Sequence, residues 1–527
     1  GKPVPAAGQQ AFIEAASQQG EAFAPLLKFV KRFSDSPLAL DGYQILISLA
    51  KSQGYDQAQF KKLAADYVRT AAPWGPLFEL RAYIDLGITL SRNAFLPELA
   101  LEYLDTAQQK LTADASTHWK ILIQSEKGRL LLQGKNPAEG LTLLNKLHEE
   151  YPFQDDITWL LARNAEQSKE DEKAIALYAE IVSLPLVERM IVESMSQGKA
   201  PLPREQYPSQ ALVRLWKAKH GGDPKGLGDY LTETFEKSIQ KIGGPKQPAR
   251  KAGEGNRVVL CELFTGTSCP PCVGADIASA AVEATFEKSE VIVLRYHQHI
   301  PAPDPLANGD AEERYSSYDG EGTPMLCVNG KQFPRVGGYM SRVPEIYRQL
   351  QETIKPYLVE KTGLKLTLSA RADQGRIAIS AKASGLESFP EDIHLKLVLA
   401  EDKISFPADN GIRFHEMVVR SMPGGVDGIE PVKGQLAYED DVDLAKLKAQ
   451  LEQSLSAIET KTTAKFNQKP LDLKALHLVA FLQNDDTGEI LQAAAIPVTG
   501  TLAISGEVPR AAPRKTVRAK APTDAAK

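Results

Sequence analysis

The segment ELFTGTSCPPCVGADIA, residues 262–278, places Cys269 and Cys272 two residues apart, with only prolines between them. Such a pair has three possible roles: a redox-active dithiol, half of a metal site, or two small apolar residues in a core. The cysteine count narrows this choice. All four cysteines of the chain lie between Cys261 and Cys327, and such tight clustering favours a site over structural cross-links.

The sequence around the pair predicts a β-α-β unit. The run RVVLCELF (257–264) is typical of a buried strand, VGADIASAAVEATFEK (273–288) of a helix, and VIVLRY (291–296) of a second buried strand. A crossover of this kind joins parallel strands. Further along, TPMLCVNGKQF (323–333) predicts another strand with a turn, and a helix is expected near 341–359.

This order of strand, Cys-x-x-Cys motif, helix and strand, followed by an x-Pro step that opens another strand, resembles the thioredoxin fold. In YDGEGTPMLCVNG, Tyr318, Gly322 and Pro324 match the family's spacing of Tyr, Gly and cis-proline. The resemblance covers residues 256–360, and the motif in this setting is specific. It implies that Pro324 is a cis-proline beside the disulfide and that the backbone of Thr323 pairs with an extended substrate.

The chemistry of disulfide exchange explains this layout. Exchange needs a thiolate, and a cysteine at a helix N-terminus has its pKa lowered by the helix dipole and by free backbone N–H groups. Pro270 and Pro271 suit the first helical turn, where their missing N–H groups cost least. Cys269 is therefore expected to be the exposed nucleophile. Cys272, one turn inward, is expected to attack the mixed disulfide and release the product.

Other residues near the motif each have two possible roles. Many thioredoxin-like proteins keep a buried carboxylate on the strand before the motif, so Glu262 is either the proton acceptor of the resolving cysteine or a surface residue. Ser268 replaces the aromatic residue often found before the first cysteine. Cys261 and Cys327 are expected to be buried free thiols on neighbouring strands, with a disulfide between them as the alternative.

His297 and His299, at the end of the second core strand, supply a metal-site alternative. With Cys269 and Cys272 they would form a two-sulfur, two-nitrogen site for zinc or copper. The simpler interpretation is a pair of polar residues at a strand end, and no other cofactor or metal is expected. His415, in NGIRFHEMVVR, is either functional or a strand-edge residue bonded to backbone.

Residues 1–242 are expected to be helical, because apolar residues recur at helical spacing. A repeat of 34 residues is visible in places, since Gly128 and Leu144 are followed one period later by Ala162 and Tyr178. The pattern resembles tetratricopeptide-like helical repeats. The alternative is an irregular helical domain with chance spacing. In either case the helices offer surface for a partner protein rather than catalytic groups.

The remainder of the chain divides by composition. A Gly/Pro/Lys-rich stretch at 243–256 predicts a linker, which leaves 257–360 for the thioredoxin-like domain. Alternating segments over 361–504 predict a β-sandwich, interrupted by a helix near 443–460. Part of this region is similar to the immunoglobulin-like domain that follows a thioredoxin-like one in large exported bacterial proteins. The basic, Pro- and Ala-rich residues 505–527 predict a disordered tail.

Length and charge set further limits. A chain of 527 residues predicts about three or four domains. The net charge of −5, spread over 24% charged residues, argues against a broad nucleic-acid-binding surface. There is no run of about 18 apolar residues, so no membrane span is expected. The sequence starts at Gly1 without a signal peptide, so we expect the mature form of an exported, periplasmic or secreted protein, or a trimmed chain.

The sequence thus predicts a multidomain protein with an all-α helical repeat, an α/β thioredoxin fold and an all-β immunoglobulin-like sandwich. The expected function is thiol–disulfide exchange with a protein substrate through Cys269 and Cys272, assisted by Thr323, Pro324 and Glu262. The flanking domains would recruit the partner. Two alternatives stay open: a non-catalytic interaction scaffold, and a metal-binding protein.

Overall fold

The computed structural model describes residues 6–17, 22–112, 116–196, 202–248, 250–251 and 254–502. The tail expected at 505–527 lies outside this part of the chain. Contacts divide the chain into two units, Gly1–Ile181 with Met190–Leu227, and Val182–Arg189 with Gly228–Lys527. None of the helices in the described ranges combines the length and the apolar composition that a bilayer span requires.

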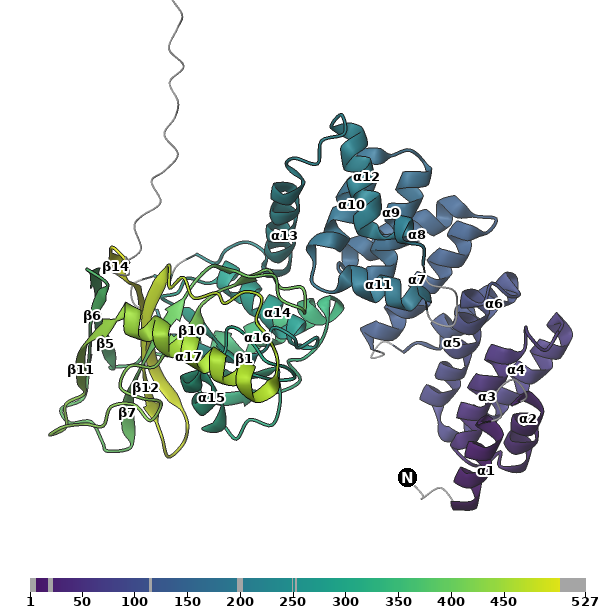
Figure 1. Ribbon diagram of the computed structural model, residues 1–527. Coiled ribbons are helices and arrows are strands. Elements are labelled where there is room, and N and C mark those ends of the chain that lie inside the picture. Colours follow the sequence, from purple (N-terminus) through teal and green to yellow (C-terminus); the bar gives the residue numbers. More distant parts are fainter. Residues whose placement is uncertain are drawn as a thin grey trace, which may run out of the picture. The chain divides into compact units, whose positions relative to one another are not determined.

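The N-terminal part of the chain is a series of helices joined by short connections (Figure 1). They are α1 (Ala6–Ala16), α2 (Phe23–Arg32), α3 (Leu38–Leu49), α4 (Gln57–Ala71), η1 (Ala72–Trp74), α5 (Pro76–Arg92), α6 (Pro97–Lys110), α7 (Thr117–Gln133), α8 (Pro137–Glu150), α9 (Asp155–Gln167), α10 (Asp171–Ser183), α11 (Val187–Ser196), η2 (Arg204–Gln206), α12 (Pro208–Lys219) and α13 (Leu227–Gly243). Several of these helices begin with proline, whose fixed φ suits the first helical position.

Close helix contacts recur along this series. A Cβ added to Gly128 would lie 2.7 Å from Cγ of Leu144, and one added to Gly87 would lie 2.5 Å from Cγ of Leu104. Glycine therefore lets α7 approach α8, and α5 approach α6, in the same way. Ala162 and Tyr178, one sequence period after Gly128 and Leu144, are likewise buried. The expectation of a helix-rich region with repetitive packing is confirmed.

The strands of the second unit, several of them labelled in Figure 1, form three sheets within the described residues. The strands are β1 (Val259–Thr265), β2 (Val291–His297), β3 (Met325–Val328), β4 (Lys331–Phe333), β5 (Lys365–Asp373), β6 (Arg376–Ser384), β7 (Ile393–Glu401), β8 (Ile404–Ser405), β9 (Phe414–His415), β10 (Val418–Ser421), β11 (Ala437–Asp443), β12 (Leu476–Asn484), β13 (Ile490–Pro497) and β14 (Thr499–Gly500). The helices are α14 (Cys272–Thr285), α15 (Gly309–Ser316), η3 (Met340–Arg342), α16 (Val343–Leu358) and α17 (Leu444–Thr462).

The β-α-β unit predicted around the cysteine pair is present. β1 and β2 are parallel and in register from Val259↔Val291 to Thr265↔His297, while β3 runs antiparallel to β1. α14 connects β1 to β2 and packs with α16 against them. Both strands are buried along their whole length, which explains why most of their residues are apolar; the charged exceptions, Glu262 and Arg295, are paired as described below.

The sheet around β1 does not end at the boundary expected between 360 and 361. β10 pairs in parallel with β2, and the N–H of Arg295 donates to the carbonyl of Met417 at 3.0 Å. β7, β12 and β13 follow, giving the order β13-β12-β7-β10-β2-β1-β3-β4 in one mixed sheet. The physical reason is that β2 would otherwise be an open edge with unpaired backbone groups. Strands expected in a separate sandwich thus extend the sheet that carries the cysteine loop.

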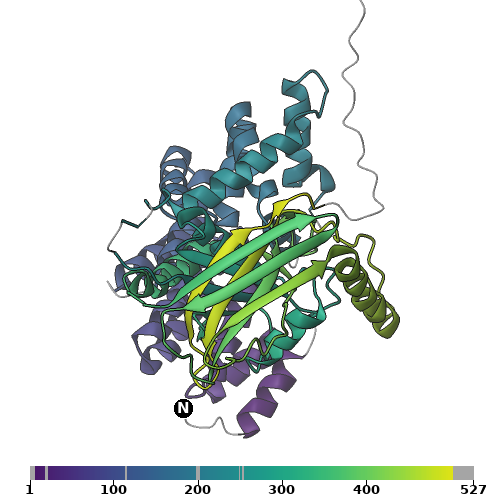
Figure 2. The same cartoon turned by 90° about the vertical axis from the view of Figure 1, so that its left-hand side faces the viewer.

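A smaller sheet of order β11-β6-β5-β14 packs on part of this larger one, as Figure 2 shows. Ile377 and Ile379 of β6 share a core with Leu395 and Leu397 of β7, and α17 contributes its apolar face to the same core. Two-layer packing is therefore present, but one layer is the extension of the large sheet. α17 corresponds to the helix expected near 443–460.

The stretch expected as a linker is fastened to the second unit wherever it is described. The guanidinium of Arg250 donates to the carbonyl oxygens of Arg257, Leu358 and Ser289. Before it, the carbonyl of Gly243 at the end of α13 accepts a hydrogen bond from the Tyr347 hydroxyl at 2.8 Å. These contacts explain why α13 belongs with the sheets and not with the preceding helices.

Candidate functional site

The two cysteines of the motif form a disulfide at the start of α14. Cys269 and Cys272 are joined by an S–S bond of 2.09 Å, with Cα atoms 5.4 Å apart. The helix begins at Cys272, so this cysteine lies among the free backbone N–H groups of the first turn. The N–H of Cys272 donates to the carbonyl of Cys269 at 3.2 Å and closes the loop.

The residues before β3 meet this disulfide. The Thr323–Pro324 peptide bond is cis. The hydroxyl of Thr323 lies 3.4 Å from Sγ of Cys269 and its carbonyl oxygen lies 3.6 Å from the same sulfur. The hydroxyl also lies 3.3 Å from the carbonyl oxygen of Ile300, so its one proton has two acceptors. Four sequence-predicted residues, Cys269, Cys272, Thr323 and Pro324, are therefore brought together.

The expectation that Cys269 is exposed is wrong. Its exposed fraction is 2%, and that of Cys272 is 0%, whereas Pro271 between them is exposed. One reason is Thr323, which lies against the sulfur. The other is the β8–β9 hairpin, whose residue Asn410 lies 141 residues further along the chain and is bonded to the backbone of Cys269 and of the loop before it.

Glu262 does not meet the disulfide. It is fully buried, so the surface interpretation is wrong. Its two carboxylate oxygens accept hydrogen bonds from Nε and Nη2 of Arg314 at 2.9 and 3.0 Å, and one of them also accepts from the Tyr318 hydroxyl at 2.5 Å. These partners lie in and just after α15, and Glu262 pairs across the sheet with Cys327. The carboxylate is thus committed to an ion pair away from the cysteines.

Asp276 is a buried carboxylate that the sequence analysis missed. It lies four residues after Cys272, so both share one face of α14. Its oxygens accept hydrogen bonds from the Thr265 hydroxyl at 2.5 Å and from Nε of Arg295 at 3.3 Å. Burial raises the pKa of Asp276, and the positive charge of Arg295 opposes that shift. Its position as the one acidic residue in the first ten of the predicted helix was a usable signal.

The two histidines expected at the end of β2 both contact Asp304, one at its carboxylate and the other at its backbone N–H. Nδ1 of His297 lies 3.0 Å from Oδ2 of Asp304, and Nδ1 of His299 accepts from the N–H of Asp304 at 2.9 Å. Burial alone would raise the pKa of Asp304, but His297 and the backbone N–H groups of Thr267 and Leu306 together hold it below its ordinary value. Asp304 thereby also fixes the loop before the motif.

The metal-binding alternative lacks a ligand set. Within the described ranges, no group of three or more His, Cys, Asp or Glu side chains is placed to hold a metal ion. Nε2–H of His415 donates a hydrogen bond to the carbonyl oxygen of Phe406 at 3.0 Å, as expected of a strand-edge residue. Its ring stacks edge-on against His297 with centroids 5.4 Å apart.

Cys261 and Cys327 are free and buried. Cys261 pairs across the sheet with Val328, and Cys327 with Glu262, so the two thiols project from opposite faces. Burial raises the pKa of both thiols, that of Cys327 to about 12. They are therefore protonated at neutral pH and unsuited to exchange.

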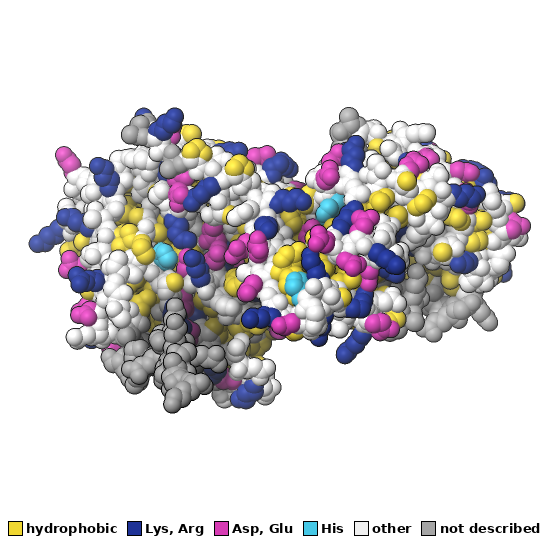
Figure 3. Space-filling view, turned by 90° about the horizontal axis from the view of Figure 1, so that it is seen from above, with side chains coloured by type: hydrophobic (Ala, Val, Ile, Leu, Met, Phe, Trp, Pro, Cys, Tyr) yellow, Lys and Arg dark blue, Asp and Glu magenta, His cyan; other side chains and the backbone are white. Residues whose placement is uncertain are grey.

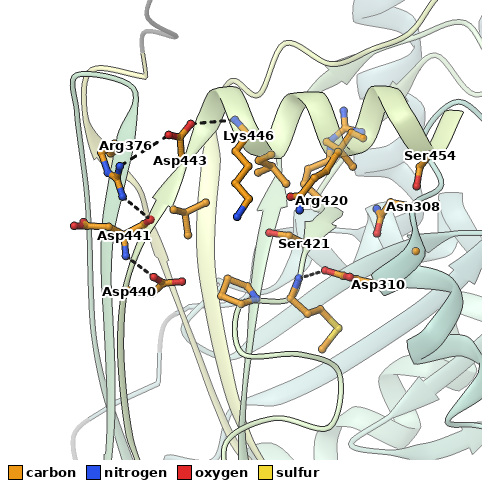
Figure 4. Close-up of a pocket in the computed structure, with 17 residues that line it drawn as sticks. Asn308, Asp310, Arg376, Arg420, Ser421, Asp440, Asp441, Asp443, Lys446 and Ser454 are labelled. Atoms are coloured by element: carbon orange, nitrogen blue, oxygen red, sulfur yellow. Dashed lines mark hydrogen bonds and ion pairs between the residues drawn. The ribbon is translucent and has the colours of Figure 1, made fainter. Parts of the chain in front are cut away.

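A cavity of about 650 Å³ lies elsewhere in the second unit, between α17, β11 and the start of α15. Figure 4 shows Asp310 bonded to the backbone of Met422, and Arg376 directed at Asp443, with Arg420 at the inner wall. None of its lining residues belongs to the cysteine loop or to the residues that contact it. Its mixed charges do not select one class of ligand.

The described surface mixes charges of both signs. Figure 3 shows basic and acidic side chains interspersed over the face that it draws, without a broad basic field.

Comparisons with known proteins give little further information. No family model matches the chain. No curated protein matches it either. Among solved structures, HBP35 of Porphyromonas gingivalis is similar over 50% of this chain and 82% of its own, with 13% sequence identity and a TM-score of 0.33. A likeness at this level carries no argument about fold or function.

Proposed function

We propose that the protein is a thiol–disulfide oxidoreductase whose reactive pair is Cys269 and Cys272 on a thioredoxin-like fold. The observation that carries the proposal is a disulfide at the first turn of α14 with the Thr323 hydroxyl and the cis Thr323–Pro324 bond beside its outer sulfur. A purely structural disulfide needs neither a helix N-terminus nor a polar group directed at one sulfur.

The topology supports this assignment. The strand order is β2-β1-β3-β4, with α14 and α16 packed on β1. A third helix, α15, lies on the other face of the sheet. This is the arrangement expected of a thioredoxin-like core. The eight-stranded sheet extends that core through β10. The proposal therefore treats the sandwich as part of the catalytic unit rather than as a separate module.

The exchange reaction balances as two thiolate attacks. With the pair reduced, the Cys269 thiolate attacks one sulfur of a substrate disulfide, forms a mixed disulfide and releases one substrate thiolate. Cys272 then loses its proton and attacks Sγ of Cys269, which reforms the Cys269–Cys272 bond and releases the second substrate thiolate. The pair is oxidised by two electrons and the substrate disulfide is reduced. In the opposite direction a substrate dithiol reduces the disulfide by the same steps reversed.

The chain's own groups serve these steps. The N-terminal N–H groups of α14 stabilise a thiolate on the pair. The Thr323 hydroxyl, when its proton turns from Ile300 to the sulfur, donates a hydrogen bond to the Cys269 thiolate. Asp276, one turn below Cys272, is the carboxylate placed to accept the resolving cysteine's proton, the role first considered for Glu262.

We assign the rest of the molecule to binding a partner or the protein substrate, and we infer the cellular compartment from the state of the cysteine pair. We infer that the N-terminal helices are tetratricopeptide-like repeats that bind a partner or the protein substrate, and that the sandwich is immunoglobulin-like. An oxidised pair suits an extracytoplasmic compartment, so an exported protein, periplasmic or secreted, fits the proposal.

A redox titration tests the proposal. The full chain is equilibrated with mixtures of reduced and oxidised glutathione, and free thiols are counted by alkylation and mass. We expect a reversible two-electron transition of the Cys269/Cys272 pair that is absent in Cys269→Ser. Cys272→Ser should accumulate mixed disulfides, and their identification gives the substrate. Cys261→Ser and Cys327→Ser are the matched controls, with an unchanged potential.

The second candidate is an interaction scaffold in which the disulfide is structural, and the 2% exposure of Cys269 favours it. This candidate predicts that no glutathione mixture reduces the pair in the folded protein. It also predicts that partner binding survives in a Cys269→Ser/Cys272→Ser double variant. Either a silent titration or a pair reduced only on unfolding would replace the enzymatic proposal by the scaffold.

A further inference from the structure

The β8–β9 hairpin, Ile404–His415, reaches the cysteine loop from far along the chain. Its arms are joined by the N–H of Phe406 donating to the carbonyl of Arg413 and the N–H of Ala408 donating to that of Ile412, each at 2.9 Å. The tip is the turn that follows, Ala408–Gly411, closed by the N–H of Gly411 on the carbonyl of Ala408. Its base is anchored in the unit, because Ile404 packs with Leu306 and Val418 and the ring of His415 lies edge-on against His297, so movement falls to the tip end of the hairpin.

The tip is bonded to the backbone that leads into Cys269. Nδ2 of Asn410 donates to the carbonyl oxygens of Gly266 at 3.1 Å and Cys269 at 3.3 Å, and its backbone N–H donates to the carbonyl of Thr267 at 2.9 Å. Asn410 is itself buried. At the rim, the Ser268 hydroxyl donates to Oδ2 of Asp409 at 2.9 Å. The loop before the reactive cysteine is thus covered by one residue and its neighbour.

Other contacts of the hairpin lie away from the disulfide. Nη2 of Arg413 donates to the carbonyl of Val182 at 3.1 Å, and a Cβ added to Gly411 would come within 3.0 Å of the backbone of Leu186. At the base, His415 bonds to Phe406 within the hairpin. Hence the bonds that hold the tip on the cysteine loop are few, and most of them come from Asn410.

We propose that the hairpin Ile404–His415 is a gate over Cys269, with Asn410 as its latch, and that it selects reaction partners by size. The inference rests on the proposed function. Reduction begins when an incoming thiolate attacks Sγ of Cys269 opposite Cys272. The new bond joins the incoming sulfur to Cys269, the Cys269–Cys272 bond breaks, and its electron pair leaves on Cys272, which then takes up a proton. Because Cys269 is only 2% exposed with the tip in place, a small thiol needs a slight displacement of the tip, whereas a folded protein reaches the sulfur only after the Asn410 bonds break.

The test compares two thiols of similar pKa, 2-mercaptoethanol and a small folded protein with one surface cysteine. Rates of reduction of the Cys269–Cys272 disulfide in the full chain are followed by acid quench, alkylation and mass. In Asn410→Ala we expect the protein thiol to react about tenfold faster, the change that corresponds to about 1.4 kcal/mol in the opening equilibrium. The rate with 2-mercaptoethanol should change less than about threefold, since a slight displacement of the tip is enough to admit it.

Two further variants isolate the effect from general destabilisation. Asp409→Ala removes only the bond to Ser268 and should give a smaller increase for the protein thiol. Asp486→Ala, at an exposed turn of the same unit, is the matched control and should leave both rates unchanged. The gate would be overturned if 2-mercaptoethanol reduces the pair but the protein thiol reacts at the same rate with the wild type, Asn410→Ala and Asp409→Ala. If 2-mercaptoethanol does not reduce the pair in any of them, the proposed function fails first.

Hydrogen exchange of the wild type gives an independent measurement should Asn410→Ala not fold. A gate opens without global unfolding, so the amides of Phe406 and Asn410 should exchange faster than those at the centres of β7 and β12. Exchange of these two amides as slow as that of the sheet core would mean that the hairpin opens only when the unit unfolds, and it would overturn the proposal.

Discussion

At the scale of single residues, a catalytic role and a structural role of Asp276 can be separated by comparing it with a second carboxylate on the same helix. It shares the face of α14 with Cys272, whereas Glu283, seven residues later on the same helix, also pairs with Arg295 but lies remote from the sulfurs. The two carboxylates therefore hold one buried guanidinium in common and differ in their distance from the reacting atoms. This makes Glu283 the natural control for any substitution of Asp276.

We predict that Asp276→Asn slows the resolving step. Reduced protein is mixed with Ellman's reagent, and the second phase of thionitrobenzoate release reports the attack of Cys272 on the mixed disulfide. Loss of a general base typically costs about 10²-fold or more, so a slowing of about that size is expected near neutral pH. The difference should shrink above about pH 8.5, where a thiol ionises unaided. A Glu283→Gln variant with the same slowing would assign the effect to Arg295 instead.

The burial of His415 leads us to predict that the free energy of unfolding falls at acid pH. Burial lowers its pKa to about 3, and the charge of neighbouring His297 adds to the shift, against an ordinary value of 6.5. In the unfolded chain this imidazole therefore takes up a proton below pH 6.5, whereas in the folded protein it stays neutral down to about pH 3. Stability from this group is fully present above pH 6.5 and is lost as the pH falls, by up to about 1.4 kcal/mol per pH unit.

The variant His415→Asn removes this proton linkage. We expect the free energy of unfolding to fall less steeply between pH 6.5 and pH 5 than in the wild type, as measured by urea unfolding of the second unit. The absolute stability at pH 7.5 serves as the reference, because the lost bond to Phe406 acts at every pH. An unchanged slope would show that His415 is protonated in the folded state.

At the scale of elements, the helix pairs of the first unit are held close by glycine. A Cβ on Gly140 would lie 2.4 Å from the backbone nitrogen of Leu132 and 2.7 Å from the carbonyl oxygen of Gly128, and neither backbone atom can give way cheaply. We predict that Gly140→Ala destabilises the unit by about 2–3 kcal/mol. Gly8→Ala in α1 of the same unit meets only ring atoms of Phe33, at 3.7 Å or more, and should be neutral or slightly stabilising.

The measurement is selective because all four tryptophans of the chain, at 74, 119, 159 and 216, belong to the first unit. Urea unfolding followed by tryptophan fluorescence therefore reports the helices alone. A Gly140→Ala midpoint equal to that of the wild type would mean that α7 and α8 separate at no cost, against the close packing described above.

Elements whose signals are local were predictable, and elements defined by distant partners were not. The strand–motif–helix–strand order and the proline before β3 are written in short stretches with clear periodicity. The hairpin that covers Cys269 is not, because its strands are two residues long and Asn410-Gly411 is typical of any turn. Asn410 acts on carbonyls 141 and 144 residues away, which no local pattern encodes.

At the scale of the whole molecule, the same limit explains the domain boundary. Alternation of apolar and polar residues indicates that one face of a strand is buried, but it does not indicate which strand is its neighbour in the sheet. β10 was expected inside a sandwich, yet it pairs with β2, and one apolar core runs from Leu260 through Ile292 and Val419 to Phe481. Composition along the chain does not encode that pairing. Consequently the cysteine loop and the sandwich belong to one continuous core.

This continuity predicts how fragments behave. A chain of residues 228–502 should fold, whereas 228–360 should not, because removal of β10 exposes the edge of β2 and removes Val419 and Phe481 from the shared core. We expect the long fragment to unfold in one cooperative transition with dispersed amide resonances. The short fragment should give collapsed resonances, dye binding and aggregation. A short fragment with a sharp transition and a reversible Cys269/Cys272 couple would show that the core of β1–β4 with α14 and α16 is autonomous, and that the extended sheet is not required for folding.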